Sequence, residues 1–360
     1  MKRKPGAVRI LAAGAVLGAT LLSTPAAADP PTEAPRIDVL IPQGEVARVR
    51  EGLRDGLREL GYVEGKGIVI QWRSHGQTEG DLAQLASALA QSKTVLIVAL
   101  GTPAARTALT ATNKPVVFAA GDPVGTGLAT SLARPGGNAT GVSTLAAELV
   151  GKRLELLHQL VPRMRRIALL KNPDNPLELS VSEKAQQAAR EFDLHVVTME
   201  AHNAAELDGT LRALKRGVAG GMLVSPDSLF RANQARIAQA TRKVGLPAIF
   251  PFSLNREDGA LISYGPSIRE ATRRMAAYVD RILKGAKPSE LPIEQMSTYE
   301  LIIDLRVARA MGIRVSEDLL LRADEVIRWL AGKPVLCRTR FARPAGEETA
   351  TSRPRALHVR

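Results

Sequence analysis

The stretch TVLIVALGTPAARTALTATNKPVVFAAG, residues 94–121, decides the fold. Residues 94–101 form an apolar run that is typical of a buried strand, and residues 115–121 form a second run of the same kind. A helix begins between them near Thr102-Pro103, where a hydroxyl residue precedes proline. Two buried strands joined by a helix are the repeating unit of a parallel sheet. The stretch therefore predicts an α/β protein, with Gly101 and Thr102 at the carboxyl end of a strand.

The same alternation continues on both sides of this stretch. Upstream, strands are expected over 37–42 and 68–74, with a helix after each. After Ser143 the alternation starts again, with strands expected at 166–172, 195–200, 220–226, 247–252 and 260–266. Helices are expected at about 146–160, after the 166–172 strand through about 191, and at 204–216, 231–244 and about 267–284. Two successive β-α series predict two doubly wound, Rossmann-like lobes joined by hinge crossovers.

The boundaries of the lobes follow from these series. Lobe 1 is expected to span residues 36–142, with a returning segment near 267–290. Lobe 2 is expected to span 143–266, with part of 291–327. Between them lies PGGNATGVS, residues 135–143, which has the glycines of a phosphate-binding loop but Val142 in place of its lysine. We interpret it as turn chemistry leading into a strand, about 141–145, that crosses between the lobes.

The two ends of the chain differ from its body. Residues 1–28 have a basic start, an apolar run of thirteen residues and an Ala-x-Ala pattern, and so predict a cleaved signal peptide. No cysteine follows the apolar run, so we expect a periplasmic protein that is not a lipoprotein. Residues 328–360 are rich in arginine and proline and are interpreted as a disordered basic tail. The alternative is a contact arm for the membrane surface.

Charge and composition exclude several functions. The net charge is +13, but residues 1–28 carry +4 and residues 328–360 carry +6, which leaves +3 for the body. A nearly neutral body argues against nucleic-acid binding. The single cysteine, Cys337, cannot form an internal disulfide, and the five histidines are scattered without a zinc pattern. No nucleophile elbow is present, so we expect no metal, no cofactor and no enzymatic activity.

Several phrases resemble the ABC-transporter substrate-binding proteins of the family that includes tryptophan and phenylalanine binders. They are GLRDGLRELGYVEGKGIVI (52–70), FAAGDPVGTGLATSLARPGGNATG (118–141), GKRLELLHQLVP (151–162), SYGPSIREATRRMAAYVDRILKGAKPSELPIEQ (263–295) and LLLRADEVI (319–327). The resemblance covers nearly all of residues 36–327. It implies the type I periplasmic-binding-protein fold and a monomeric receptor that closes on a small, amino-acid-like solute and delivers it to an ABC permease in the inner membrane. A receptor that reports its ligand to a membrane sensor is the alternative.

Ligands of doubly wound sheets lie beyond the carboxyl ends of the strands, which here means the cleft between the lobes. We expect Thr102 to donate to a ligand carboxylate, beside Gly101, although it can equally serve as a plain N-cap. Asp227 is the leading candidate for a ligand ammonium group, and its alternative role is to cap the helix over 231–244. The other candidates at strand ends are Asp122, Asn172, Asn175, Ser225, Phe250, Ser253 and Tyr264. Turn capping competes with ligand contact for Asp122 and the two asparagines, and core packing competes for Phe250.

Overall fold

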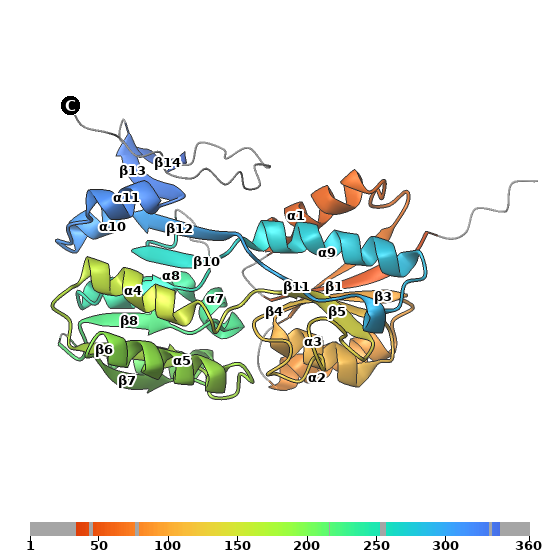
Figure 1. Cartoon of the computed structure of the whole chain (residues 1–360), viewed down its shortest axis with the longest axis horizontal. Helices are drawn as coiled ribbons and strands as arrows, with labels where there is room; N and C mark the ends of the chain where they lie inside the picture. Colours follow the sequence, from red (N-terminus) through yellow and green to blue (C-terminus); the bar gives the residue numbers. More distant parts are fainter. Residues whose placement is uncertain are drawn as a thin grey trace, which may run out of the picture. The chain divides into compact units, whose positions relative to one another are not determined.

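The computed structural model of the chain describes residues 34–42, 46–75, 79–215, 217–252, 257–330 and 333–338. The expected signal peptide and the last part of the expected tail, 339–360, lie outside the described residues. Two sheets with helices on both faces make up the described chain (Figure 1). The predicted α/β architecture of two doubly wound lobes is therefore confirmed.

The sheet of lobe 1 has the strand order β11-β5-β4-β3-β1-β2, and all its pairings are parallel. Its strands are β1 (Arg36–Pro42), β2 (Val69–His75), β3 (Leu96–Leu100), β4 (Val116–Ala120), β5 (Ala139–Ser143) and β11 (Glu294–Gln295). The first four begin and end within two residues of their predicted bounds. The strand expected at about 141–145 begins at Ala139 and is the fifth strand of this sheet, so the chain crosses to lobe 2 only after Ser143.

Two pairs of helices cover the faces of this first sheet (Figure 1). On one face lie α1 (Val46–Glu59) and α9 (Ile268–Leu283), whose apolar residues share one buried cluster with the strands. On the other face lie α2 (Glu79–Ala90) and α3 (Thr102–Ala111) with a second cluster. The segment near 267–290, expected to return to lobe 1, thus contributes the helix that packs along α1.

The sheet of lobe 2 has the order β14-β13-β12-β10-β9-β8-β6-β7. Its strands are β6 (Arg166–Lys171), β7 (His195–Glu200), β8 (Gly221–Val224), β9 (Ala248–Phe250), β10 (Ile262–Pro266), β12 (Tyr299–Asp304), β13 (Glu325–Leu330) and β14 (Lys333–Arg338). The pairs β10–β12 and β13–β14 are antiparallel, and the others are parallel. Residues 328–330 and 333–338, expected in a disordered tail, instead lie in the hairpin of β13 and β14.

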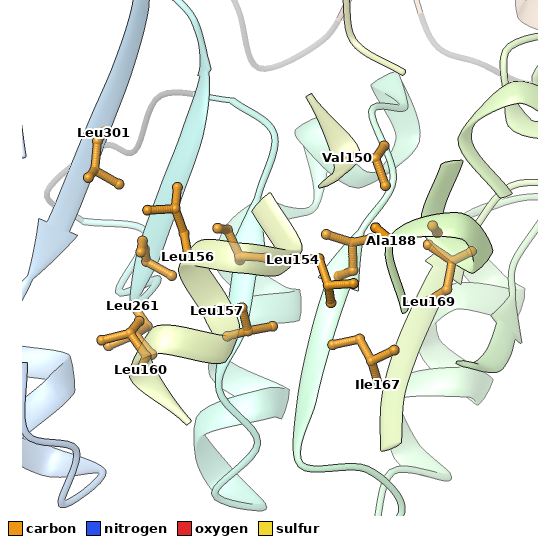
Figure 2. Packing of buried hydrophobic residues seen from close by; sticks show 14 of the residues in the cluster. Val150, Leu154, Leu156, Leu157, Leu160, Ile167, Leu169, Ala188, Leu261 and Leu301 are labelled. Atoms are coloured by element: carbon orange, nitrogen blue, oxygen red, sulfur yellow. The ribbon is translucent and has the colours of Figure 1, made fainter. Parts of the chain in front are cut away.

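The helices of lobe 2 are α4 (Val150–Leu160), α5 (Glu178–Glu191), α6 (Ala204–Arg212), α7 (Ser228–Ala232), α8 (Gln234–Lys243), α10 (Leu305–Ala310) and α11 (Glu317–Arg322). Leucines spaced three and four residues apart on α4 bury one helix face against the sheet. Figure 2 shows Leu154, Leu157 and Leu160 of α4 among the buried side chains of neighbouring elements. The helix expected over 231–244 is two helices, of which α7 begins at Ser228, one turn earlier than predicted.

The glycines of the 135–143 stretch have a packing role. Gly141 lies in β5 with φ of 149°, and a Cβ atom there would lie 2.0 Å from the carbonyl oxygen of Phe118 in β4. Gly136, with φ of 82°, lies in the turn before β5. Gly141 therefore permits the close approach of two strands, while the crossover itself begins at Thr144.

Candidate functional site

A cleft of about 760 Å³, counting the part open to solvent, lies between the two lobes. Its lining residues follow strands β1, β3, β4 and β5 of lobe 1 and strands β6, β8, β9 and β10 of lobe 2. They are Pro42, Leu100, Gly101, Thr102, Pro103, Ala119, Ala120, Gly121, Thr144, Ala146, Asn175, Leu177, Pro226, Asp227, Ser228, Arg231, Pro251, Phe252, Pro266 and Ile268. The cleft is mainly apolar, as small-molecule sites in proteins usually are.

Two glycines of lobe 1 lie close to side chains of lobe 2 along this cleft. A Cβ atom on Gly101 of lobe 1 would lie 3.5 Å from the Ser228 hydroxyl of lobe 2. A Cβ atom on Gly121 would lie 2.5 Å from a methyl group of Leu177, so a larger residue there would require that side chain to move. These contacts bring the start of α3 and the start of α7 to the same part of the cleft.

Thr102 is a buried lining residue that opens α3, and no side chain caps that helix. Gly101 precedes it with φ of 87°, a conformation that favours glycine. Within the described residues, the Thr102 hydroxyl forms no hydrogen bond. The first amides of an α-helix also have no acceptor inside the helix. The start of α3 therefore presents donors to the cleft.

Asp227 lines the cleft but is already well coordinated. One oxygen, Oδ1, accepts from the Leu229 amide at 2.7 Å, which makes Asp227 the N-cap of α7. The other, Oδ2, accepts from the side-chain amides of Asn175 at 2.8 Å and Asn172 at 3.3 Å. Burial raises the pKa of Asp227, and these hydrogen bonds offset part of the increase. Asp227 therefore has the contacts of a helix cap, which is the role that we weighed against ammonium binding.

The two asparagines support this carboxylate from the loop after β6. Asn175 lines the cleft, donates to Pro226 O at 3.2 Å and accepts from the Leu177 amide at 3.0 Å. Asn172 is buried behind the lining, where its oxygen accepts from the Asp174 amide at 3.1 Å. Both amide side chains thus hold the loop and Asp227 in place.

Of the remaining candidates, the four that the structure describes are not among the lining residues of the cleft. Asp122 accepts from the Gly125 amide at 2.8 Å and so caps a turn. Ser225 is buried at the end of β8, Phe250 belongs to a buried cluster of lobe 2, and Tyr264 lies beside Tyr299 with ring centroids 6.0 Å apart. Ser253 lies outside the described residues.

Sequence reasoning missed Arg231, which is buried and lines the cleft. Its guanidinium carbon lies 5.3 Å from the centre of the Phe252 ring, and its Nη1 donates to Gln234 Oε1 at 3.2 Å. The signal was present in the sequence, because Asp227 followed by Ser-Leu-Phe is a helix start. A helix that begins at Ser228 places Arg231 one turn later on the same face.

Behind the lining, Glu178 at the start of α5 is a second buried carboxyl group. It accepts from the Ser182 hydroxyl at 3.0 Å. Burial raises its pKa to about 7, and the nearby charge of Asp227 adds to this, while Lys171 acts in the opposite direction. Lys171 itself pairs with Glu200, with 3.2 Å between Nζ and Oε1.

Three chain crossovers connect the lobes beside the cleft, and buried Arg153 of α4 binds one residue in the first crossover and one residue just before the second. Its Nε donates to Tyr264 O in β10 at 2.8 Å, and its Nη1 donates to Ala146 O after β5 at 3.1 Å. The amide of Ala146 donates to Gly121 O of lobe 1 at 3.3 Å, and Leu145 just before it has a positive φ of 51°. The third crossover runs from β11 to β12, which begins at Tyr299.

The described residues hold no group of three or more His, Cys, Asp or Glu side chains arranged to bind a metal ion. Across the same residues, the longest apolar helices fall short of what a membrane crossing requires. Among the described residues, the lining of the cleft combines apolar side chains with hydroxyls, the Asn175 amide, the Asp227 carboxylate and the Arg231 guanidinium.

Comparison with known proteins gives consistent results. The family described as ABC transporter substrate binding protein matches residues 37–327. A tyrosine-binding protein from Clostridioides difficile (strain R20291) is 24% identical over 294 residues, which are 80% of this chain and 84% of the relative.

Two solved structures, each 25% identical, cover 82% of this chain and 100% of their own. One is a conserved domain protein from Vibrio cholerae, with a TM-score of 0.75, and the other is an ABC domain from Streptococcus pneumoniae in complex with L-Trp, with a TM-score of 0.71. More distant binding proteins and regulators share the two-lobe fold, in agreement with the expected type I architecture. The chain is thus a non-enzymatic solute-binding protein and belongs to the ABC transporter substrate-binding protein family.

Proposed function

We propose that the chain is a periplasmic receptor that captures a small, amino-acid-like organic solute in the cleft between its lobes. Hinge closure about the three crossovers would enclose the solute, and the closed receptor would then deliver it to an ABC permease. The observation that carries the proposal is the cleft itself, because both lobes line it at the carboxyl ends of their strands. The relatives named for tyrosine and L-Trp make aromatic amino acids the first ligands to test.

A thermal-shift screen of the amino acids and related aromatic acids tests this proposal, followed by calorimetry on the compounds that raise Tm. We expect one compound class to bind in a 1:1 ratio and to be recovered chemically unchanged. Small-angle scattering with and without that compound measures closure, which should reduce the radius of gyration. Binding without compaction would contradict the hinge mechanism, and turnover of the compound would contradict the receptor assignment.

A further inference from the structure

In this cleft, some hydrogen-bond donors have no protein partner within the described residues, whereas the carboxylate of Asp227 already accepts hydrogen bonds from the protein. Among the lining residues that the structure describes, Asp227 is the only carboxylate, and its two oxygens accept three hydrogen bonds from the protein. The hydroxyls of Thr102 and Ser228 form no hydrogen bond within the described residues. The groups that remain for a ligand are therefore mainly donors.

The lobe 1 contribution is the start of α3. This helix has ten residues, its N-terminus faces the cleft through Gly101 and Thr102, and Pro103 has no amide hydrogen. Thr102 is 4% exposed, so its hydroxyl is withdrawn from bulk water while it lines the cleft without a protein partner in the described chain. Donors of this kind at the positive end of a helix favour an anion.

The lobe 2 contribution is Arg231 on α7. Its side chain is 6% exposed, and the contact with Phe252 and the hydrogen bond to Gln234 fix its position. Ser228 lies one turn earlier on the same helix face and approaches Gly101 across the cleft. Arg231 and the start of α3 therefore line the same cleft from opposite lobes, and an anion bound to both would link the lobes.

We propose that the ligand class is organic carboxylates with an apolar body, anchored by Thr102 and the start of α3 on one side and by Arg231 on the other. The carboxylate is the required end of the ligand, whereas an amino group is not required. Leu100, Leu177, Phe252 and Ile268 provide the apolar wall for the body. This inference rests on the proposed function, since it names the solute for the same cleft.

The test compares matched probes by calorimetry on the full-length mature protein. L-Tryptophan, L-phenylalanine and L-tyrosine are each paired with the acid that lacks the amino group and with the amine that lacks the carboxylate, for example indole-3-propionate and tryptamine. We expect each acid to bind within about tenfold of its amino acid, and each amine to bind at least about 30-fold more weakly. An amine that binds as well as its amino acid, or an acid more than 30-fold weaker, overturns the inference while leaving the receptor function intact. Failure of every probe would instead count against the proposed function, and the inference falls with it.

Variants then locate the anchor. Thr102→Val and Arg231→Gln should each weaken binding of the carboxylate probes by about 10- to 100-fold, the range expected for a hydrogen bond to a charged group. Thr102→Ser should restore most of the affinity, because it keeps the hydroxyl. Thr110→Val and Arg106→Gln on the exposed part of α3 are matched controls and should change affinity less than twofold.

Thermal unfolding of each variant separates loss of binding from loss of fold. Thr102→Val with unchanged Tm and unchanged affinity would overturn the assignment of α3 as the anchor. If Arg231→Gln unfolds, Arg231→Lys takes its place in the test, because lysine keeps the charge but not the planar guanidinium. Weaker carboxylate binding by that folded variant supports the anchor, and unchanged affinity for every carboxylate probe removes Arg231 from it.

Discussion

At the scale of single residues, Asp227 shows how one buried side chain organises the lobe 2 wall of the cleft. Its carboxylate joins the loop after β6, through Asn172 and Asn175, to the start of α7. The sequence identified the residue and offered two roles for it. The local pattern could not choose between them, because the two asparagines lie more than fifty residues away in the chain.

Replacing Asp227 should cost stability. We expect Asp227→Ala to lower the free energy of unfolding by about 2–3 kcal/mol, because it removes a helix cap and leaves buried amide donors without acceptors. Urea unfolding followed by circular dichroism measures the change. Asp227→Asn is the matched variant and should cost less, since its oxygen can still cap α7. A loss below about 0.5 kcal/mol in Asp227→Ala would contradict the structural role.

Glu178 should make stability depend on pH. Its folded-state pKa is about 7 against an ordinary value of 4.5, so the folded chain binds more protons between these two values. The free energy of unfolding therefore falls as pH rises from about 4.5 to about 7, and the contribution is absent below this window. We expect Glu178→Gln to be more stable than the parent at pH 8, on the order of 2 kcal/mol, with little difference at pH 4.5.

Urea unfolding at pH 4.5, 6 and 8 checks this expectation. Glu183→Gln on the exposed side of the same helix is the control and should follow the parent at each pH. The same gain at all three pH values would show that proton binding by Glu178 is not the cause.

At the scale of elements, the closest helix contact in lobe 1 is that between α1 and α9. A Cβ atom on Gly52 would lie 2.2 Å from Thr272 Oγ1 and 2.3 Å from Arg269 O, and one on Gly56 would lie 2.6 Å from Arg273 O. Spaced four residues apart, these glycines form a flat strip on which α9 lies. The periodicity of residues 46–60 predicted α1. It could not predict the packing partner α9, which begins more than two hundred residues later.

Gly52→Ala should therefore destabilise the protein although alanine is the better helix former. We expect a loss of about 1–3 kcal/mol, since the added methyl group overpacks the interface between the helices. Gly209→Ala in α6 is the matched control, because nothing lies within 4 Å of its added methyl group. That variant should gain up to about 1 kcal/mol from helix propensity. Equal effects in thermal or urea unfolding would contradict the packing argument.

The crossovers provide a second prediction at this scale. Arg153 is fully buried, and burial lowers the pKa of its guanidinium to about 9, so it stays charged at neutral pH. Its hydrogen bonds to Ala146 O and Tyr264 O join α4 to one crossover and to the strand that leads into another. We expect Arg153→Met to keep the fold but to raise amide hydrogen exchange in 144–149 and 262–266 by tenfold or more, with weaker ligand binding.

Arg190→Met on the exposed end of α5 is the control for this variant. Unchanged exchange at both segments in Arg153→Met would show that the guanidinium does not fix the crossovers. Faster amide exchange in only one of the two segments would show that the guanidinium fixes that segment alone.

At the scale of the whole molecule, the sequence predicted the alternation of strands and helices and the edge of the sheets where the cleft lies. It did so because both depend on local periodicity and on the handedness of β-α-β units. It did not predict Arg231 in the cleft, Tyr264 beside a crossover or the β13–β14 hairpin. These placements depend on long-range packing, and in the case of Arg231 on a helix start that differs by a single turn.

The packing of α9 on lobe 1 also bears on the order of folding. The apolar face of β1, β3 and β4 is completed by Met275, Val279 and Met296, which are made after all of β1–β10. During synthesis, α1 covers part of that face, and the rest stays uncovered until α9 and Met296 have been made. The first lobe to begin folding therefore cannot finish until most of the chain has been made, and lobe 2, whose sheet still needs β12 and β13, finishes later still.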